Sequence, residues 1–358
     1  MKVLIAGGGT GGHLYPGIAI ARELLRHAGS EVLFVGTEQG IESRVLPKEN
    51  LPVRYITAGK LKGMGVGAIV KTMVLLPLGM FQSARLLGAF RPQVVIGVGG
   101  YASAPVAFAA WLLRIPLIVV EPNSYAGLAN RLIGRIADSV VLSFPGTNEQ
   151  GFFPAAKAVV TGPLVRDGID KGLREKALTE FGLSHDRFTV LVFGGSGGAH
   201  AINSAMKEAA GSLQGVKGLQ VLHQTGEKDV EEVKAGYGNA AVAAVVLPYI
   251  YDMAGAYAAA DLVICRSGAT TVAELAVCGK PSVLVPYPFA ADNHQEYNAR
   301  TLAARGTAEV VLQKELTADA LARIIRKHAE AGRAQAPRME TQAAAEIVRI
   351  CKKHVQKD

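Results

Sequence analysis

One short stretch of the chain, residues 265–299, holds a carboxylate, hydroxyls and amides at close spacing. It opens with Cys265-Arg266-Ser267-Gly268-Ala269, a pattern typical of a strand end followed by a tight turn that exposes backbone groups. Thr270, Thr271 and Glu274 fall in the first turns of the helix that follows, where a carboxylate can accept hydrogen bonds from two adjacent sugar hydroxyls. Two amides complete the polar set: Gln295 and Asn298. This combination favours a nucleotide sugar as the ligand.

Two glycine-rich loops, each placed between an apolar run and a helical stretch, repeat one another along the chain. The first is Gly7-Gly8-Gly9-Thr10-Gly11-Gly12-His13, and the second is Gly194-Gly195-Ser196-Gly197-Gly198-Ala199-His200. Glycine at a strand-to-helix turn removes the Cβ that would hold a ligand away from the backbone, so N–H groups and a helix N-terminus can face phosphate. We therefore predict two nucleotide-fold domains that work on a phosphorylated ligand in a cleft between them.

Short apolar runs alternate with helical stretches throughout the chain, which is the βαβ pattern of parallel sheets. The expected strands are residues 3–6, 32–35, 53–57, 94–98, 117–120, 139–142, 158–160, 190–193, 219–222, 243–247, 262–265, 282–285 and 308–312. The fold class is therefore α/β, with two doubly wound sheets. We predict a first domain at 1–162, with a C-terminal helix at 341–358 packing back on it, and a second domain at 163–340.

Composition agrees with two packed α/β domains in a reducing compartment. The chain has 358 residues, 49% of them hydrophobic and 19% charged, and its three cysteines lack any metal-binding spacing. The net charge of +8 permits attraction to phosphates or anionic lipids, but the sequence has no nucleic-acid-binding motif. The N-terminus is too short in apolar residues for a signal peptide, and glycines and proline interrupt the uncharged stretch 92–113. We expect neither a nucleic-acid partner nor a membrane-spanning helix.

The first glycine loop also matches the G-x-G-x-x-G fingerprint of dinucleotide-binding proteins. That fingerprint requires an acidic residue at the end of the second strand. Here the strand expected at 32–35 is followed by Gly36-Thr37-Glu38, so that Glu38 lies beyond the strand end. A nicotinamide-dependent oxidoreductase is therefore a disfavoured alternative.

Several further motifs occur in an order that points to one family. Besides the first glycine loop and the stretch 265–299, they are Gly99-Gly100-Tyr101, Glu121-Pro122-Asn123, Gly162-Pro163-Leu164-Val165-Arg166 and Gly194-Gly195-Ser196. In these motifs, through both halves, the chain resembles the MurG family of GT-B glycosyltransferases. The resemblance implies two Rossmann-like domains and an inverting transfer of N-acetylglucosamine from UDP-N-acetylglucosamine to undecaprenyl-diphosphate-linked muramyl pentapeptide in peptidoglycan synthesis.

The resemblance also implies site residues. The implied donor-binding residues are Arg166, Ser196, Ile250, Arg266, Ala269, Thr270, Thr271, Glu274, Gln295 and Asn298. The implied acceptor and diphosphate residues are Thr10, Gly11, Gly12, Tyr101 and Asn123. The chain departs from the family pattern at two positions where relatives often carry glutamine: Gly197 and His294.

The general base that removes the acceptor proton is one of two residues. His13 is the first candidate because histidine accepts protons near neutral pH, and Glu121 is the second. A histidine after a glycine loop can instead cap a helix, and we interpret His200 as a surface residue because one site needs one base. Paired acidic residues of the D-x-D type do not occur in the candidate loops, so we expect no metal and no cofactor.

A second alternative shares the fold. A UDP-sugar epimerase would act on UDP-N-acetylglucosamine without an acceptor and would need no membrane-facing surface. The uncharged run 74–81, flanked by Lys60, Lys62, Lys71, Arg85 and Arg91, bears on this choice. It is either a buried helix with a kink at Pro77 or a membrane-docking patch. The resemblance implies peripheral binding at the cytoplasmic face of the inner membrane.

Overall fold

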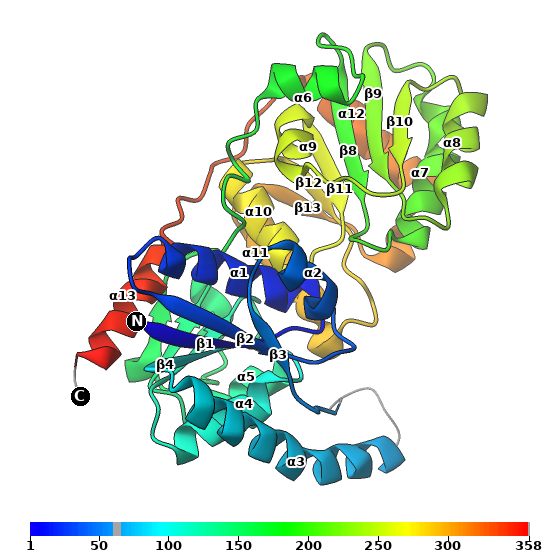
Figure 1. The fold of residues 1–358 in the computed structure, drawn as a ribbon. Helices are drawn as coiled ribbons and strands as arrows, with labels where there is room; N and C mark the ends of the chain where they lie inside the picture. Colours follow the sequence, from blue (N-terminus) through cyan, green and yellow to red (C-terminus); the bar gives the residue numbers. More distant parts are fainter. Residues whose placement is uncertain (60–65, 357–358) are drawn as a thin grey trace. The chain divides into compact units, whose positions relative to one another are not determined.

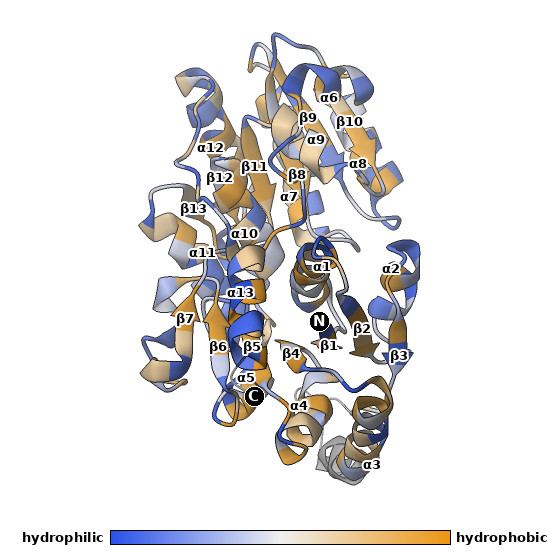
Figure 2. Cartoon of the chain, turned by 60° about the vertical axis from the view of Figure 1, so that its left-hand side comes forward, coloured by the Kyte–Doolittle hydropathy of each residue, from blue (hydrophilic) through white to orange (hydrophobic). Residues whose placement is uncertain are grey.

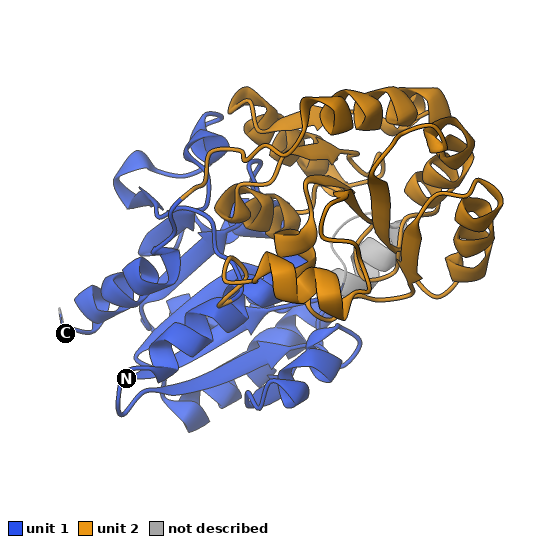
Figure 3. Ribbon diagram, turned by 90° about the horizontal axis from the view of Figure 1, so that it is seen from above, with its two compact units in different colours: residues 1–166, 340–358 blue, residues 167–339 orange. Residues whose placement is uncertain are grey.

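The computed structural model describes residues 1–59 and 66–356, and the side chains of all of these except 66–74. The chain forms two compact α/β units (Figure 3). Unit 1 comprises Met1–Arg166 together with Glu340–Asp358, and unit 2 comprises Asp167–Met339. The C-terminal segment thus belongs to the same unit as the N-terminus.

Unit 1 is built on a parallel seven-stranded sheet in the order β3-β2-β1-β4-β5-β6-β7 (Figure 1). Its strands are β1 Lys2–Gly7, β2 Glu31–Gly36, β3 Val53–Tyr55, β4 Val94–Gly99, β5 Leu117–Glu121, β6 Ser139–Leu142 and β7 Ala158–Val160. Its helices are α1 Gly11–Leu25, α2 Glu42–Lys48, α3 Val66–Phe90, α4 Ser103–Leu112, α5 Leu128–Ile133 and α13 Ala343–Val355, with 3-10 turns at Pro145–Asn148 and Ala155–Lys157. The strand order reverses between β1 and β4, which is where open α/β sheets bind ligands.

Helices cover both faces of this sheet because alternate strand residues point to opposite sides. Val3 and Ile5 of β1 join the core under α1 and α13, whereas Leu4 and Ala6 join the core under α3, α4 and α5. Helix α13 contacts α1 and buries Ile347 completely, which stabilises the unit by about 2 kcal/mol for such a side chain.

Unit 2 repeats the design with a parallel six-stranded sheet in the order β10-β9-β8-β11-β12-β13. Its strands are β8 Phe188–Phe193, β9 Leu219–Gln224, β10 Ala244–Leu247, β11 Leu262–Cys265, β12 Ser282–Leu284 and β13 Ala308–Val310. Its helices are α6 Arg174–Glu180, α7 His200–Leu213, α8 Val230–Asn239, α9 Met253–Ala259, α10 Ala269–Cys278, α11 His294–Ala304 and α12 Ala318–Ala331, with 3-10 turns at Ala291–Asn293 and Gln313–Glu315. The strand order reverses between β8 and β11.

The core of unit 2 follows the same alternation of strand residues. Val190 and Val192 of β8 pack in the cluster that α7, α8 and α12 cover. On the other face the Phe193 ring meets Tyr257 of α9 edge to face, with the ring centroids 6.1 Å apart. Figure 2 shows the strands of both sheets as mostly hydrophobic, as expected for parallel sheets covered on both sides.

The predicted fold class is confirmed, and each expected strand is present with ends shifted by at most about two residues. Helix α1 begins at Gly11, because the last glycines of the loop already have helical backbone angles. Within the described residues, no helix is both long and apolar enough to cross a bilayer.

Candidate active site

The first glycine loop closes against the turn after β4 at the switch point of unit 1. The Gly8 N–H donates to the Gly99 carbonyl at 3.3 Å. Gly100 has φ +85°, and a Cβ there would lie 2.2 Å from the Gly8 carbonyl oxygen. The Ser103 hydroxyl lies within hydrogen-bonding distance of both the Ala6 and Gly99 carbonyls, at 2.7 and 2.8 Å. Only glycine fits this crossing of two backbones, so the loop is rigid before any ligand binds.

His13 sits in the first turn of α1 above this crossing. Its ring lies against Gly99, where a Cβ would be 2.6 Å from His13 Cδ2. Its Nδ1 lies 3.2 Å from the Thr10 hydroxyl, within hydrogen-bonding distance. The half-buried imidazole is thus packed against Gly99, with Nδ1 directed at Thr10. The partly exposed ring of Tyr101 lies beside Gly9.

Glu121, the other candidate base, ends β5 in a buried cage of donors. Its carboxylate accepts hydrogen bonds from the Asn123 N–H and side-chain amide, both at 2.9 Å. It also accepts from the Gly127 N–H at 2.8 Å and the Asn130 amide at 2.9 Å. Burial raises the pKa of Glu121, and these four hydrogen bonds oppose the rise. The carboxylate therefore fixes the loop that carries Asn123.

A residue that the sequence analysis missed, Glu42, braces the first glycine loop. This fully buried carboxylate accepts hydrogen bonds from the Gly9 N–H at 2.7 Å, the Thr37 N–H at 2.8 Å and the Thr37 hydroxyl at 3.1 Å. Three glycines leave it room, since a Cβ at any of them would lie 2.4 Å or less from a Glu42 side-chain atom: Gly8, Gly36 and Gly40.

The position of Glu42 explains why the fingerprint in this loop is not that of a dinucleotide site. The Gly9 N–H donates to the chain's own carboxylate, while Glu38, the acid considered from sequence, is exposed. Two glycines that precede Glu42, Gly36 and Gly40, were the available sequence signal for this buried carboxylate.

The second glycine loop, residues 194–199, follows β8 at the switch point of unit 2. Gly198 has φ +75° and packs so closely that a Cβ there would lie 1.8 Å from the Thr225 carbonyl oxygen. Ser196 and Gly197 at the tip are exposed. A cradle of this kind offers backbone and hydroxyl groups to an anionic ligand.

Gln224, at the end of β9, ties this loop to the segment after β10. Its side-chain amide donates to the Gly195 carbonyl at 2.8 Å, and its oxygen accepts the Ile250 N–H at 2.9 Å. The sequence analysis missed this buried residue, although a polar side chain ending an apolar strand was a signal for it. The Ile250 N–H, at a position expected to contact the donor, is therefore already hydrogen-bonded within the protein.

Helix α10 presents its amino end beside that loop. Its N-cap is Gly268, which provides no capping side chain, so the positive end of the helix dipole at residues 269–271 has no side-chain cap. Glu274 lies one turn further and is only 2% exposed.

Tyr257 orients the Glu274 carboxylate. The phenol hydroxyl donates to Glu274 Oε2 at 3.0 Å. Burial, together with the nearby Glu274, raises the pKa of Tyr257 well above its usual value, so that the phenol stays protonated as a donor.

Arg266 is engaged in several contacts within the protein. Its guanidinium donates to the Val285 and Pro286 carbonyls, each at 3.1 Å, and to the Gln313 side chain at 2.6 Å. It also lies over the Tyr287 ring, 5.5 Å from the centroid, and burial lowers its pKa. Arg266 therefore holds the turn after β12 in place.

Asn298 supports the turn before α10. It is completely buried, and its amide donates to the Ser267 carbonyl at 3.1 Å. Gln295 is partly exposed and its side-chain oxygen accepts the Tyr287 N–H at 3.0 Å. The sequence pattern of α11 could not show that Gln295 is partly exposed and Asn298 buried, because the packing of this helix is known only from the fold.

The remaining expected residues divide between the units. Arg166 belongs to unit 1, where its guanidinium lies 5.0 Å from the centroid of the Tyr15 ring of α1. His294 begins α11, with Nδ1 2.7 Å from the Ala291 carbonyl oxygen. At Gly197 a side chain would meet nothing within 4 Å.

Two doubly wound parallel sheets, each with a glycine loop at its switch point, define the GT-B class of sugar-nucleotide enzymes. The models of the glycosyltransferase family 28 N-terminal and C-terminal domains match residues 3–142 and 189–354, and the chain therefore belongs to glycosyltransferase family 28. The predicted GT-B glycosyltransferase is confirmed.

Named relatives agree with this family. The chain is 49% identical, over 91% of its length and 84% of the relative's, to the UDP-N-acetylglucosamine–N-acetylmuramyl-(pentapeptide) pyrophosphoryl-undecaprenol N-acetylglucosamine transferase of Myxococcus xanthus. The crystal structure of Acinetobacter baumannii MurG matches with a TM-score of 0.75 and 33% identity, covering 98% of this chain and 99% of that one. A UDP-GlcNAc 2-epimerase from Neisseria meningitidis shares the fold at a TM-score of 0.68 over 100% of each chain, but with only 14% identity.

Proposed function

We propose that this chain transfers N-acetylglucosamine from UDP-N-acetylglucosamine to the lipid-linked muramyl pentapeptide, converting lipid I to lipid II in peptidoglycan synthesis. The observation that carries the proposal is the 49% identity, over 91% of the chain, to a relative named for this reaction. The epimerase alternative has only fold-level support, at 14% identity.

In this proposal unit 2 binds the donor. The N-terminus of α10, which has no side-chain cap, and the exposed Ser196 face the diphosphate, because a helix dipole and hydroxyls stabilise negative charge. Glu274, already oriented by Tyr257, accepts the ribose hydroxyls with its remaining lone pairs. The backbone at Ile250 meets uracil, and Gln295 meets a hydroxyl of the donor sugar.

Unit 1 then provides the acceptor side and the base. A hydroxyl of the acceptor sugar attacks the anomeric carbon, its proton passes to His13 Nε2, and the bond from the anomeric carbon to the UDP oxygen breaks with inversion. Thr10 holds Nδ1 on the opposite side of the ring. The N–H groups of α10 stabilise the charge on departing UDP. Thr10, Gly11, Gly12, Tyr101 and Asn123 form the surroundings of the acceptor.

The acceptor dependence of UDP release tests this function. UDP should appear only when a short-chain lipid-linked muramyl pentapeptide accompanies UDP-N-acetylglucosamine. Conversion of the sugar nucleotide without an acceptor would instead identify an epimerase, and a requirement for a nicotinamide cofactor would identify an oxidoreductase.

We also propose that the protein works as a peripheral protein at the cytoplasmic membrane surface, docking through α3 and the end of α4. Leu78 and Phe81 of α3 are 45% and 61% exposed, and Arg85 lies over the Phe81 ring. Trp111 and Leu112 of α4 are 51% and 62% exposed, and α4 packs on α3 (Figure 1). Exposed apolar side chains bordered by a cation are typical of interfacial contact.

Part of the run expected at 74–81 lies outside the described side chains, as do Lys60, Lys62 and Lys71. Among the described ones, Gly79 is buried while Leu78 and Phe81 are exposed, so the run is not wholly core. The exposed pair supports the docking proposal more than the buried-helix alternative.

A further inference from the structure

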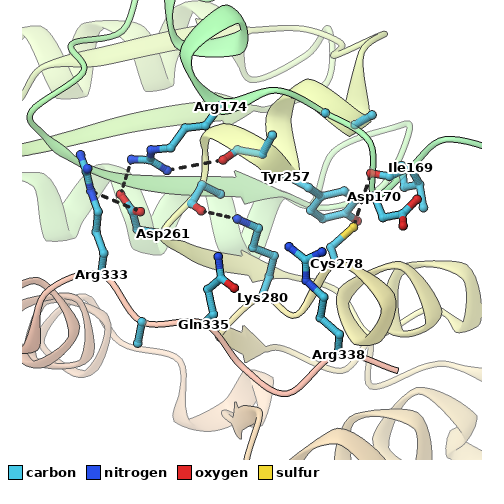
Figure 4. Close-up of a pocket in the computed structure, with 15 residues that line it drawn as sticks. Ile169, Asp170, Arg174, Tyr257, Asp261, Cys278, Lys280, Arg333, Gln335 and Arg338 are labelled. Atoms are coloured by element: carbon cyan, nitrogen blue, oxygen red, sulfur yellow. Dashed lines mark hydrogen bonds and ion pairs between the residues drawn. The ribbon is translucent and has the colours of Figure 1, made fainter. Parts of the chain in front are cut away.

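Unit 2 contains a cavity of about 350 Å³ at the sheet edge opposite the candidate donor site (Figure 4). The donor site lies beyond the carboxyl ends of β8 and β11. The cavity instead lies at the amino ends of β11 and β12, where Asp261 and Lys280 stand just before their strands. Its volume is within the range of small-molecule sites. It therefore stands apart from the proposed transfer chemistry.

Positive charge exceeds negative charge around this cavity. Its charged lining residues are Arg174, Lys280, Arg333, Arg338, Asp170 and Asp261. Asp261 is already committed to two of the cations, because its Oδ2 accepts Arg174 at 3.0 Å and its Oδ1 lies 3.7 Å from Arg333. Arg174 also donates to the Ala259 carbonyl at 2.6 Å.

The other two cations, Lys280 and Arg338, have no carboxylate partner within the described residues. The Lys280 ammonium donates to the Ala260 carbonyl at 2.9 Å. Burial lowers its pKa, the nearby positive charges of Arg174 and Arg338 lower it further, and the negative charge of Asp261 partly opposes this shift. Arg338 forms no ion pair with Asp170, the remaining carboxylate of the lining among the described residues, although Figure 4 shows both near Cys278. Lys280 is half-buried and Arg338 is exposed, and their positive charges repel one another, so an anion bound between them would relieve that repulsion.

The remaining wall limits the size and chemistry of what fits. Small apolar surfaces are contributed by Gly172, Ala254 and Ala258. The side-chain amide of Gln335 adds a hydrogen-bond donor to the lining. A compact anion with several acceptor oxygens and a small organic part matches such a lining.

We propose that this cavity binds a phosphate-bearing small molecule, with Lys280 and Arg338 as its charged contacts. Arg338 lies one residue before the end of unit 2, and Asp170 lies near its beginning. The backbone around Arg338 is held to α10 and its C-cap by the Ala336 N–H to the Gly279 carbonyl at 3.0 Å and the Met339 N–H to the Ala276 carbonyl at 2.8 Å. A bound phosphate bridges Arg338 to Lys280 and adds a further tie to this terminal segment.

Calorimetric titration of the full chain at constant ionic strength tests the proposal with two probes, inorganic phosphate and glucose 6-phosphate. Lys280→Met and Arg338→Met should each weaken binding about tenfold or more, since each removes a charge-assisted contact. Lys234→Met, a matched loss of an exposed lysine on α8, should leave binding unchanged. Lys280→Arg, which keeps the charge, should bind within a few-fold of the parent.

Affinity for UDP should be the same in all these variants, which shows that they are folded and keeps the result independent of the transfer activity. Tighter binding of glucose 6-phosphate identifies a phosphomonoester as the ligand, and equal binding identifies phosphate itself. Hydrogen exchange at residues 333–339 should slow when the probe binds. Absence of binding by both probes up to about 20 mM, or binding that both methionine variants retain, would overturn the proposal.

Discussion

The Glu42 brace offers a direct test of how the first glycine loop is held. In Glu42→Gln the side-chain volume is nearly unchanged, and the amide oxygen can still accept from Thr37. The NH₂ group then faces the Gly9 N–H, which donates to the carboxylate at 2.7 Å in the parent. A donor thus meets a donor in a site where glycines crowd the side chain on three sides.

The expected size of the effect follows from these contacts. Leaving the Gly9 N–H without an acceptor costs about 1–3 kcal/mol, and losing the charge from the two Thr37 hydrogen bonds adds about 1 kcal/mol. We expect the free energy of unfolding of unit 1 to fall by about 2–4 kcal/mol. Turnover should fall about tenfold or more because the loop also carries Thr10 and positions His13.

Urea unfolding followed by tryptophan fluorescence measures this effect in the right unit. Trp111 is the only tryptophan in the sequence, and it lies in α4 of unit 1. Glu38→Gln is the matched control, since Glu38 is exposed in the same turn, and its unfolding free energy should stay within about 0.5 kcal/mol of the parent. If Glu42→Gln also stays within that range, the carboxylate does not brace the loop and our reasoning is wrong.

Four further predictions address the other parts of the account. Glu274→Ala should weaken UDP binding by about 1.5–3 kcal/mol, measured by calorimetry, because a charge-assisted pair of hydrogen bonds is lost. His13→Ala should lower turnover about a hundredfold while UDP affinity stays near the parent value. Leu78→Glu with Phe81→Glu should reduce sedimentation with anionic liposomes and spare UDP binding, because it places charge on the exposed apolar surface. The free energy of unfolding should fall by about 2 kcal/mol from pH 7 to pH 5 because of His223. Urea unfolding at a series of pH values should show that His223→Gln lacks this pH dependence.

The sign of the last prediction follows from burial. His223 is enclosed with Tyr237 and Asn203 as hydrogen-bond partners at 3.0 and 3.1 Å, and burial lowers its pKa from 6.5 to about 3. Between these pH values the unfolded chain binds a proton at His223 that the folded chain does not. The contribution of His223 to the free energy of unfolding is therefore fully present above pH 6.5 and decreases as the pH falls.

Other outcomes would contradict these expectations one by one. Unchanged UDP affinity in a folded Glu274→Ala variant would remove Glu274 from the donor site. Turnover within a few-fold of the parent in His13→Ala would place the base elsewhere. Unaltered liposome binding of the double variant would move membrane contact to another surface, and an equal pH slope in parent and His223→Gln would assign it to other groups.

The strands of both sheets and the glycine loops that follow β1 and β8 were predictable because local sequence patterns determine them. Apolar runs such as those of β1 and β8 precede glycine loops whose backbone angles only glycine adopts easily, and both signals are contained in a few adjacent residues. The C-terminal helix was predicted at 341–358, and α13 spans Ala343–Val355 within that range.

The supporting side chains were not predictable in the same way because their partners are distant in sequence. Glu42 reaches Gly9 across 33 positions and Gln224 reaches Gly195 across 29. Asn298 holds the turn before α10 and Arg266 holds the turn after β12, through contacts that form only once the strands are assembled. Residue type and spacing identified the region of the site, but the residues that hold its backbone became apparent only from the hydrogen bonds of the assembled fold.

The central claim is that unit 2 delivers N-acetylglucosamine to a lipid-linked acceptor with inversion. Mass spectrometry and proton NMR of the product formed from UDP-N-acetylglucosamine and a short-chain lipid-linked muramyl pentapeptide test it most directly. We predict one added N-acetylglucosamine with the anomeric coupling of a β-linkage. An unmodified acceptor, or an α-linked product, would contradict the account.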